Sequence, residues 1–367
     1  MTKDMYYILS PCGTSVLTNH AGDDRRIILK YANEKEKENI PAEDRAKLED
    51  IIKEAGEKLR KAELTEARRM SAELNAIIGI YDGRRPNTSD FHKLISTDTW
   101  LGKEAAELVK SWIRVQNNNA RVNIHVQKDL QTDSVSEFQL ALTELVKALD
   151  KEVRSYSGSG YKVIFNLTGG FKSVQGFLQS IANFLADETV YIFQRSNELL
   201  RIPRLPVKLD ALSFVEDNMD FFRNIEVKTM TSVPNKLPET FIIEVGGEIL
   251  LSPWGTVVWR ESRADLYKKR LWPSPASDKI RFSKRFEKAV EALSADRRFE
   301  INKRIDELNT YFWKDFNPNS LNFKPLSGNP KKGSTHEFYA WSDGAAKRIF
   351  GHYEDELFVI DELGDHL

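Results

Sequence analysis

Two adjacent glycines, a lysine and small polar side chains follow a predicted strand at residues 161–166, and this combination is suited to binding a phosphate. Gly169 and Gly170 have no Cβ, so the chain can turn sharply and a ligand can approach the backbone. Apolar residues then recur at helical spacing from Phe177 to Leu185. A helix that begins beside such a turn points free N–H groups and a positive dipole end outward. The expected contacts with the anion come from Asn166, Thr168, Gly169, Gly170 and Lys172.

A second polar loop follows the first predicted strand, Tyr6 to Leu9. A third polar segment, which includes Thr97, ends the predicted strand 91–97. In an open α/β sheet, ligands bind outside the carboxyl ends of the strands, where the winding reverses. We therefore expect the three segments to line one crevice. The further contacts are Ser10, Cys12, Gly13, Thr14, Ser15 and Thr97.

Other interpretations of these loops are open. Neither loop has the spacing of a Walker loop or of G-x-G-x-x-G, so ordinary ATP or NAD binding is not indicated. A tight strand-to-helix turn without any ligand needs the same glycines. Cys12 has no histidine near it in the sequence, and we interpret it as a small buried residue rather than a nucleophile.

The C-terminal part carries residue types that can cleave RNA without a metal. His336, His352 and His366 are three of the six histidines of the chain. The segment from Lys279 to Lys332 contains 13 basic and 7 acidic residues. The segment from Glu337 to Asp365 contains 2 basic and 8 acidic residues. The basic part suits a phosphate backbone, and the acidic strands are expected to be solvated. Cleavage needs a base for the 2′-hydroxyl, cations for the phosphorane and an acid for the 5′-oxygen.

The elements that must position the first group of residues alternate between strand and helix. Alternation of this kind predicts parallel βαβ units and an α/β Rossmann-like domain. A charged helical segment at residues 23–80 interrupts the pattern. We expect it either to be a solvated helical hairpin on the sheet or to dock a partner. The predicted elements are strands 91–97, 122–126, 161–166, 190–193 and 198–202 and helices 103–117 and 134–154.

Composition limits the class of protein. The 367 residues are 41% hydrophobic, which is enough for two or three domains, and the net charge is −1. With Cys12 as the single cysteine, the chain excludes internal disulfides and thiolate-rich zinc sites, and we predict no metal and no other cofactor. It has neither a signal peptide nor an apolar run that could span a bilayer, so we expect a cytoplasmic protein with no membrane partner.

The two glycine-containing loops resemble those of the CARF domain, the CRISPR-associated Rossmann-fold sensor. The matching segments are Ser10 to Ser15 and Asn166 to Lys172, and the resemblance covers residues 1–205, with 23–80 as a helical insertion. It implies a homodimer that binds a cyclic oligoadenylate between its CARF domains. The expected activator is cyclic tetra-adenylate.

Residues 206–275 predict a different module. The spacing of Leu212, Val215, Met219 and Phe222 indicates one amphipathic helix, and Phe241 to Leu251 forms a hairpin around two glycines. Ser252 and Pro253 are typical of a helix start. Helix, hairpin and helix resemble a winged helix-turn-helix, which can serve as a linker and dimerisation module or can read DNA.

Residues 278–367 resemble the RelE/HigB family of ribosome-dependent mRNA interferases, an α+β fold with an antiparallel sheet. Two predicted helices, near 283–292 and 296–311, precede strands near 337–341, 347–353 and 356–362. The motifs that carry the resemblance are Phe282 to Phe286, Leu326 to Gly328, His336 to Tyr339, Lys347 to Phe350 and Leu363 to His366.

The resemblance implies roles for particular residues. Arg348 matches the arginine that binds the scissile phosphate, and His366 takes the place of the late acid. Glu337 and Tyr339 stand where some members carry lysines, which leaves the general base open. The complete set of predicted catalytic residues is Arg348, His366, Lys347, His336, Tyr339 and Lys332.

Together the resemblances predict a switch of type III CRISPR antiviral defence. A cyclic oligoadenylate activates a metal-independent endoribonuclease that cuts mRNA on the ribosome. A ligand-sensing transcription regulator that uses the winged helix is the alternative. A metal-dependent nuclease built on Glu226-Val227-Lys228 is a third hypothesis, since E-x-K occurs in such enzymes.

Overall fold

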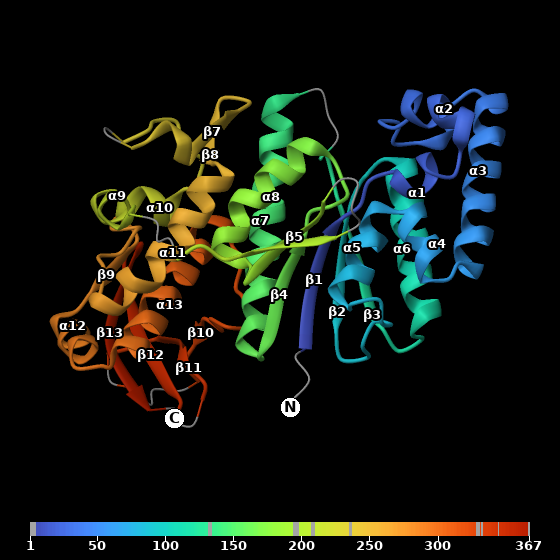
Figure 1. Cartoon of the computed structure of the whole chain (residues 1–367). Coiled ribbons are helices and arrows are strands. Elements are labelled where there is room, and N and C mark those ends of the chain that lie inside the picture. Colours follow the sequence, from blue (N-terminus) through green and yellow to red (C-terminus); the bar gives the residue numbers. More distant parts are fainter. Residues whose placement is uncertain are drawn as a thin grey trace. The chain divides into compact units, whose positions relative to one another are not determined.

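The chain forms two compact units, Met1–Lys208 and Leu209–Leu367, in a computed structural model (Figure 1). The structure describes residues 5–130, 134–193, 198–206, 210–234, 237–327, 331, 333–343 and 345–365. The predicted domain boundary at residue 205 lies close to the boundary between the units. The segments predicted as a second and a third domain both belong to unit 2.

Unit 1 contains a six-stranded sheet in the order β3-β2-β1-β4-β5-β6. The first five strands run parallel, and β6 is antiparallel to β5. The Rossmann-like α/β architecture predicted from the sequence is confirmed, and the winding reverses between the neighbours β1 and β4. The strands are β1 Met5–Pro11, β2 Phe91–Thr97, β3 Arg121–Gln127, β4 Tyr161–Asn166, β5 Glu188–Ile192 and β6 Leu199–Pro203.

Helices cover both faces of this sheet, because its strands are apolar on both sides. Ile8 belongs to the core that α5 and α6 cover. Tyr7, which precedes it in β1, points to the opposite face and contacts Glu152 and Tyr156 of α7. The helices are α1 Ser15–Thr18, α5 Ala72–Ile80 and α6 Trp100–Gln116 on the first face, and α7 Val135–Gly158 and α8 Lys172–Leu185 on the second.

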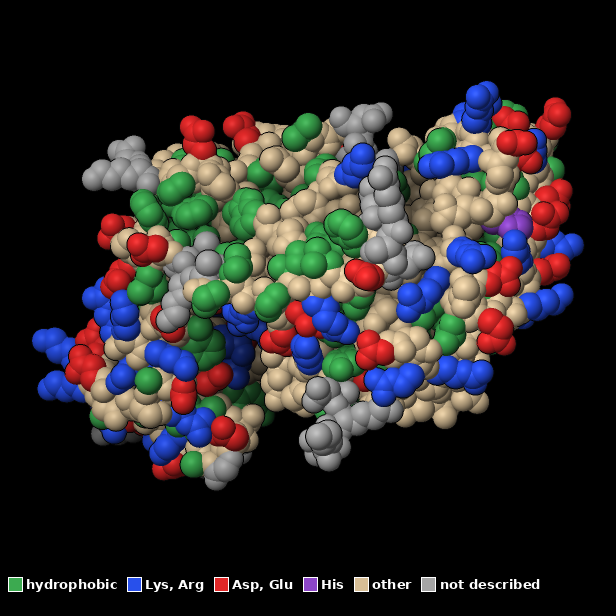
Figure 2. All heavy atoms as spheres, viewed as in Figure 1, with side chains coloured by type: hydrophobic (Ala, Val, Ile, Leu, Met, Phe, Trp, Pro, Cys, Tyr) green, Lys and Arg blue, Asp and Glu red, His purple; other side chains and the backbone are tan. Residues whose placement is uncertain are grey.

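The charged segment 23–80 is helical, as predicted, and packs through a narrow apolar stripe. On α3 the buried positions are Leu48, Ile51, Ala55 and Leu59, which face the core shared with α6. Acidic and basic side chains are interspersed over its outer surface (Figure 2). Its elements are η1 Gly22–Asp24, α2 Arg25–Lys30, η2 Lys37–Asn39, α3 Ala42–Lys61 and α4 Leu64–Met70.

The N-terminal part of unit 2 differs from the prediction at its start. The single helix expected there is two short ones, because the chain turns at Asn218. The hairpin turns at Gly246 and Gly247, both with positive φ, and Ser252 caps the next helix by accepting a hydrogen bond from the Gly255 N–H. The elements are α9 Leu212–Asp217, α10 Met219–Asn224, η3 Glu239–Phe241, β7 Ile242–Val245, β8 Glu248–Leu251 and α11 Pro253–Lys269.

The C-terminal part of unit 2 is a five-stranded sheet in the order β10-β11-β12-β13-β9. Residues of α12 and α13, such as Phe286 and Ile305, share a core with Phe338, Ile349 and Ile360 on one face of the sheet. Sequence analysis missed the two short strands β9 and β10. The elements are β9 Ile280–Phe282, α12 Lys284–Glu291, α13 Ala295–Lys314, β10 Lys324–Pro325, β11 His336–Trp341, β12 Lys347–Glu354 and β13 Leu357–Asp365.

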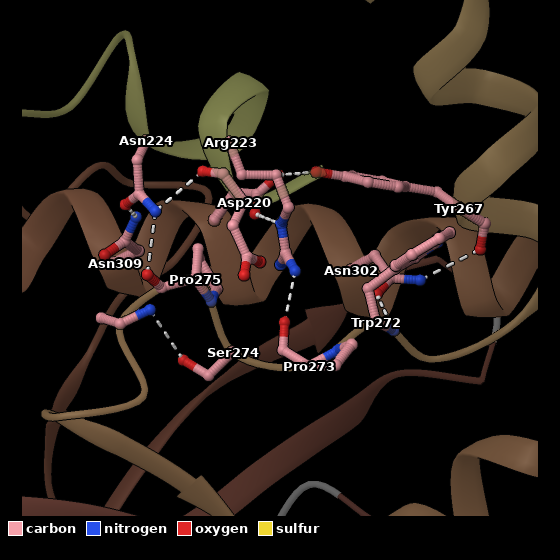
Figure 3. A network of polar contacts seen from close by, with 12 residues as sticks. Asp220, Arg223, Asn224, Tyr267, Trp272, Pro273, Ser274, Pro275, Asn302 and Asn309 are labelled. Atoms are coloured by element: carbon pink, nitrogen blue, oxygen red, sulfur yellow. Dashed lines mark hydrogen bonds and ion pairs between the residues drawn. The ribbon is translucent and has the colours of Figure 1, made fainter. Parts of the chain in front are cut away.

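A buried polar network joins the two parts of unit 2 (Figure 3). The guanidinium of Arg223 on α10 bonds Asp306 on α13 at 2.6 Å and also bonds the carbonyl of Pro273. Asp306 also accepts a hydrogen bond from the hydroxyl of Tyr267 on α11. Asn302 of α13 donates to two carbonyls at the end of α11 and accepts the Trp272 N–H. Segment 270–276 is therefore held firmly and is not a loose linker.

No described helix is both long and apolar enough to cross a membrane.

The network predicts a large stability effect at Asp306. Its side chain is 19% exposed and compensates the fully buried charge of Arg223. Asp306→Asn leaves that charge uncompensated and is expected to lower the free energy of unfolding by about 3 kcal/mol. Asp343, which pairs with Arg297 but is 70% exposed, supplies the control, and Asp343→Asn is expected to cost less than about 1 kcal/mol. Urea denaturation of both variants measures the difference, and equal midpoints would contradict this account.

Candidate functional site

The loops after β1 and β4 meet at the carboxyl edge of the unit 1 sheet. A Cβ on Gly13 would come within 3.3 Å of the Gly170 backbone, and a Cβ on Gly170 would come within 2.8 Å of the Pro11 side chain. Gly170 also has a φ of +96°, which disfavours any other residue. The Cys12 N–H donates to the Ile95 carbonyl at the end of β2. The structure thus brings together the loops that sequence analysis placed at one crevice.

A buried carboxylate holds the first loop in position. Glu73 on α5 is fully buried and accepts hydrogen bonds from the Gly13 N–H at 2.9 Å, the Ser15 hydroxyl at 2.6 Å and the Ser71 hydroxyl at 2.7 Å. These bonds compensate the charge, which would otherwise be costly in the core. Sequence analysis missed Glu73, although an isolated acid in the otherwise uncharged and largely apolar stretch 72–80 was an available signal.

Several of the predicted contact residues are buried, and their side chains bond to the backbone or side chains of the loops instead of facing the crevice. Asn166 donates to the Ser10 hydroxyl at 3.1 Å and to the Glu73 carbonyl, and Ser10 and Asn166 are fully buried. Thr97 is also buried, and its hydroxyl contacts that of Thr99, the residue that caps α6. Burial raises the pKa of the Cys12 thiol well above its ordinary value, with a smaller contribution from Glu73, so this thiol is not a nucleophile at neutral pH.

The other predicted contacts are accessible and surround the start of α8. Thr14, Ser15 and Thr168 are half-buried, whereas Lys172 is exposed at the first position of the helix. No side chain caps this helix start, so its first N–H groups point outward. Lys172 makes no ion pair with any residue that the structure describes. Free N–H groups, a glycine turn and a free ammonium group together favour a phosphate.

In unit 2, Arg348 lies on the face of the sheet opposite the helices. It pairs with Tyr339 across β11 and β12, and its guanidinium stacks on the Tyr339 ring with 3.6 Å between carbon and ring centroid. Arg348 is 3% exposed, yet its Nε and Nη1 have no hydrogen-bond partner in the part of the chain that the structure describes. A hydrogen bond from Arg348 and its positive charge lower the pKa of the Tyr339 hydroxyl. A buried cation with free donors is suited to receive an anion.

A second cation lies beside Arg348. Lys331 reaches over Gly364, which is opposite Arg348 on β13, and a Cβ at Gly364 would lie 3.1 Å from the Lys331 Nζ. Glu362 holds Lys331 at 2.7 Å, and Glu337 pairs with Lys324 at 3.4 Å. Both carboxylates are largely buried. The expectation that the acidic strands are solvated is therefore wrong for these two residues, because neighbouring lysines neutralise them.

The remaining predicted catalytic residues have different surroundings. His336 belongs to the core face, where its ring stacks on Phe323, and burial lowers its pKa. Lys347 pairs with Asp365 at 2.6 Å. Lys332 and His366 lie outside the described residues.

The described residues contain no group of three histidine, cysteine or carboxylate side chains arranged to hold a metal. The Glu226-Val227-Lys228 motif follows α10 in a turn, whereas the metal-nuclease hypothesis needs it on a strand.

A comparison with known families matches part of the chain. Residues 68–205, which include the loop after β4, match the family model described as CRISPR-associated protein (Cas_APE2256). The match supports a CRISPR-associated role for the chain. It ends within unit 1 and covers less than half of the sequence. No curated protein matches the chain.

The position of Glu73 gives a prediction for the crevice. Glu73→Gln replaces one acceptor oxygen with an N–H₂ group that faces donors, so the mutation breaks one charge-assisted bond and strains the first loop. We expect a loss of about 2–3 kcal/mol in the free energy of unfolding of unit 1. Glu57→Gln, at an exposed position of α3, is the control and is expected to be neutral within about 0.5 kcal/mol. Urea denaturation measures the change in stability, and hydrogen exchange of the Gly13 amide measures the change in the loop. If Glu73→Gln leaves both unchanged, the role assigned to Glu73 is wrong.

Proposed function

We propose that the protein is a cyclic oligoadenylate-activated endoribonuclease of type III CRISPR defence. Unit 1 is the sensor, and the C-terminal part of unit 2 cuts mRNA on the ribosome. The observation that carries the nuclease assignment is the buried guanidinium of Arg348, whose Nε and Nη1 lack partners among the described residues. A group this costly to bury is explained by a ligand that binds it, and a phosphodiester supplies the matching acceptors.

The crevice of unit 1 supports the sensor role. Its accessible groups are those that suit the phosphates of a cyclic oligonucleotide: the free start of α8, Gly170 and Lys172. Polar side chains at Thr14 and Thr168 border the same edge. In a homodimer two such crevices meet one ring-shaped ligand. The ligand activates unit 2 only to the extent that it binds the active state more tightly than the inactive one.

The chemistry proposed for unit 2 is attack of a 2′-hydroxyl on the neighbouring phosphorus. Arg348 and Lys331 bind a phosphate of the RNA strand and hold the strand in position for this attack. Tyr339 holds the guanidinium in place through its ring. The products are a 2′,3′-cyclic phosphate and a 5′-hydroxyl, and the reaction needs no metal.

The transcription-regulator alternative has weaker support. Helix α11, which would read DNA in a winged helix-turn-helix, packs within unit 2 against α9, η3 and α13. A backbone carbonyl lies against Gly255 at its start, and its exposed residues Asp265, Lys268 and Lys269 have mixed charge. This helix therefore has a scaffold role.

Ligand-stimulated cleavage is the first test. In a translation mixture with EDTA controls on the isolated protein, cyclic tetra-adenylate is expected to induce cleavage of ribosome-bound mRNA. Lys172→Ala removes a charged contact worth about 1.5–3 kcal/mol, so half-maximal activation is expected at about 10–100-fold more ligand. Lys151→Ala, an exposed lysine of α7, is expected to behave like the wild type. If Lys172→Ala responds to the ligand like the wild type, the crevice is not the ligand site. If the protein binds a specific DNA sequence and cleaves no RNA, the transcription-regulator alternative is favoured.

Loss of Arg348 tests the nuclease site. Arg348→Ala is expected to lower the cleavage rate by about 10²-fold, because it removes the donors that hold the RNA in position for attack, and to leave the affinity for the cyclic oligoadenylate unchanged. Arg60→Ala, an exposed position of α3, controls for the loss of one positive charge. Rates are measured at saturating ligand. Full activity of Arg348→Ala with wild-type stability would overturn the assignment.

A further inference from the structure

A histidine–carboxylate pair occupies the same open face of the unit 2 sheet as Arg348. His352 Nδ1 lies 2.9 and 3.0 Å from the two carboxylate oxygens of Asp361, across β12 and β13. Asp361 also accepts the Ser334 hydroxyl at 2.7 Å, which fixes the carboxylate. The imidazole is thereby oriented with Nε2 pointing away from Asp361, 3.4 Å from Glu354. This arrangement is the one that proteins use to prepare an imidazole for proton transfer.

A β-bulge creates the pair. Phe350 is opposite Glu362, but the next residue of β12, Gly351, is opposite Ile360, so Asp361 is an extra residue in β13. In a regular strand the side chains of Asp361 and Glu362 would point to opposite faces. The bulge turns both to the open face, where Asp361 holds His352 and Glu362 holds Lys331.

We propose that His352 is the general acid of the RNA cleavage reaction and that Asp361 positions it. The inference rests on the proposed ribonuclease function and adds a proton donor to it. His352 and Arg348 are four residues apart on one face of β12, about 13 Å along the strand, with the buried ring of Phe350 between them. They therefore contact different phosphates of one single strand, and the scissile phosphate is at His352.

The step conserves atoms and protons. The 2′-oxygen forms a bond to phosphorus and gives its proton to water, and the bond between phosphorus and the 5′-oxygen breaks. The departing 5′-oxygen takes the Nε2 proton of the His352 imidazolium. Arg348 and Lys331 hold the flanking phosphate, and Asp361 stabilises the imidazolium through Nδ1 until the proton leaves.

The charges around His352 agree with this role. Two carboxylates face it, Asp361 from β13 and Glu354 from its own strand, and Arg281 from β9 pairs with Glu354. The hydrogen bond with Asp361 raises the pKa of His352 most, and Glu354 raises it further, although partial burial opposes them. A larger fraction of the imidazole is therefore protonated at neutral pH than in an unperturbed histidine.

The test compares His352→Gln and Asp361→Asn with the wild type in the ligand-activated cleavage assay. His352→Gln is expected to lower the rate by about 10²-fold or more. Asp361→Asn removes the main cause of the raised pKa, so activity is expected to fall off at lower pH than in the wild type. Glu356→Gln, exposed in the turn between the same strands, is the control and is expected to keep both rate and pH profile. Thermal unfolding midpoints of all variants exclude loss of fold.

A substrate with sulfur in place of the scissile 5′-oxygen separates a proton donor from a structural residue. A thiolate leaves without a proton, so His352→Gln is expected to recover most of its lost rate on this RNA, whereas Arg348→Ala is not. If the wild type cleaves and His352→Gln keeps its rate, or if sulfur gives no recovery, this inference fails and the proposed function stands. If the activated wild type cleaves no RNA, the proposed function fails and this inference with it.

Discussion

Buried charge is the constraint on which both units depend, because a charged side chain in a core must be compensated by nearby partners. In unit 1 the carboxylate of Glu73 meets one N–H group and two hydroxyls, and in doing so fixes the first ligand loop. In unit 2 Arg223 meets Asp306 and the Pro273 carbonyl. Arg348 differs from Arg223 in two ways: no described carboxylate pairs with it, and both its Nε and its Nη1 lack a hydrogen-bond partner among the described residues, whereas in Arg223 only Nη2 does. The paired charges stabilise the fold, and the unpaired guanidinium of Arg348 is the basis of the proposed phosphate site.

Much of the fold could be predicted from the sequence, because strand and glycine patterns act locally. The strands 91–97 and 161–166 were predicted with the bounds that the structure has, and Ser252 and Pro253 correctly marked the start of α11. The meeting of the loops after β1 and β4 could be predicted because parallel strands bring their carboxyl ends to one edge. Gly169 and Gly170 were informative for a different reason: the packing around them leaves no room for a side chain, so only glycine fits.

The residues that the sequence did not reveal depend on tertiary contacts. Glu73 is the single charged residue of the apolar helix α5, but its partners Gly13 and Ser15 are distant in the sequence, so its role is evident only in the folded chain. Asp361 and Glu362 share a face only because of a bulge, which changes the register by one residue and has no signal in the hydrophobic pattern. The helix predicted across residues 212–222 has the right apolar spacing, but the chain breaks it at Asn218 to form α9 and α10.

The Arg223 network also limits how a signal can act on unit 2. Segment 270–276 is held by Arg223, Asn224 and Asn302, which come from both parts of the unit. Separating the N-terminal and C-terminal parts of unit 2 would expose the Arg223–Asp306 ion pair and break the hydrogen bonds of Asn224 and Asn302 at once. A movement of unit 2 as a whole breaks none of these and is far less costly. A ligand bound in unit 1 has only its difference in affinity between two states with which to drive a change. If unit 1 binds the activator as proposed, the less costly route is one in which unit 2 responds as a single body, so that the sheet with Arg348 and His352 keeps its geometry.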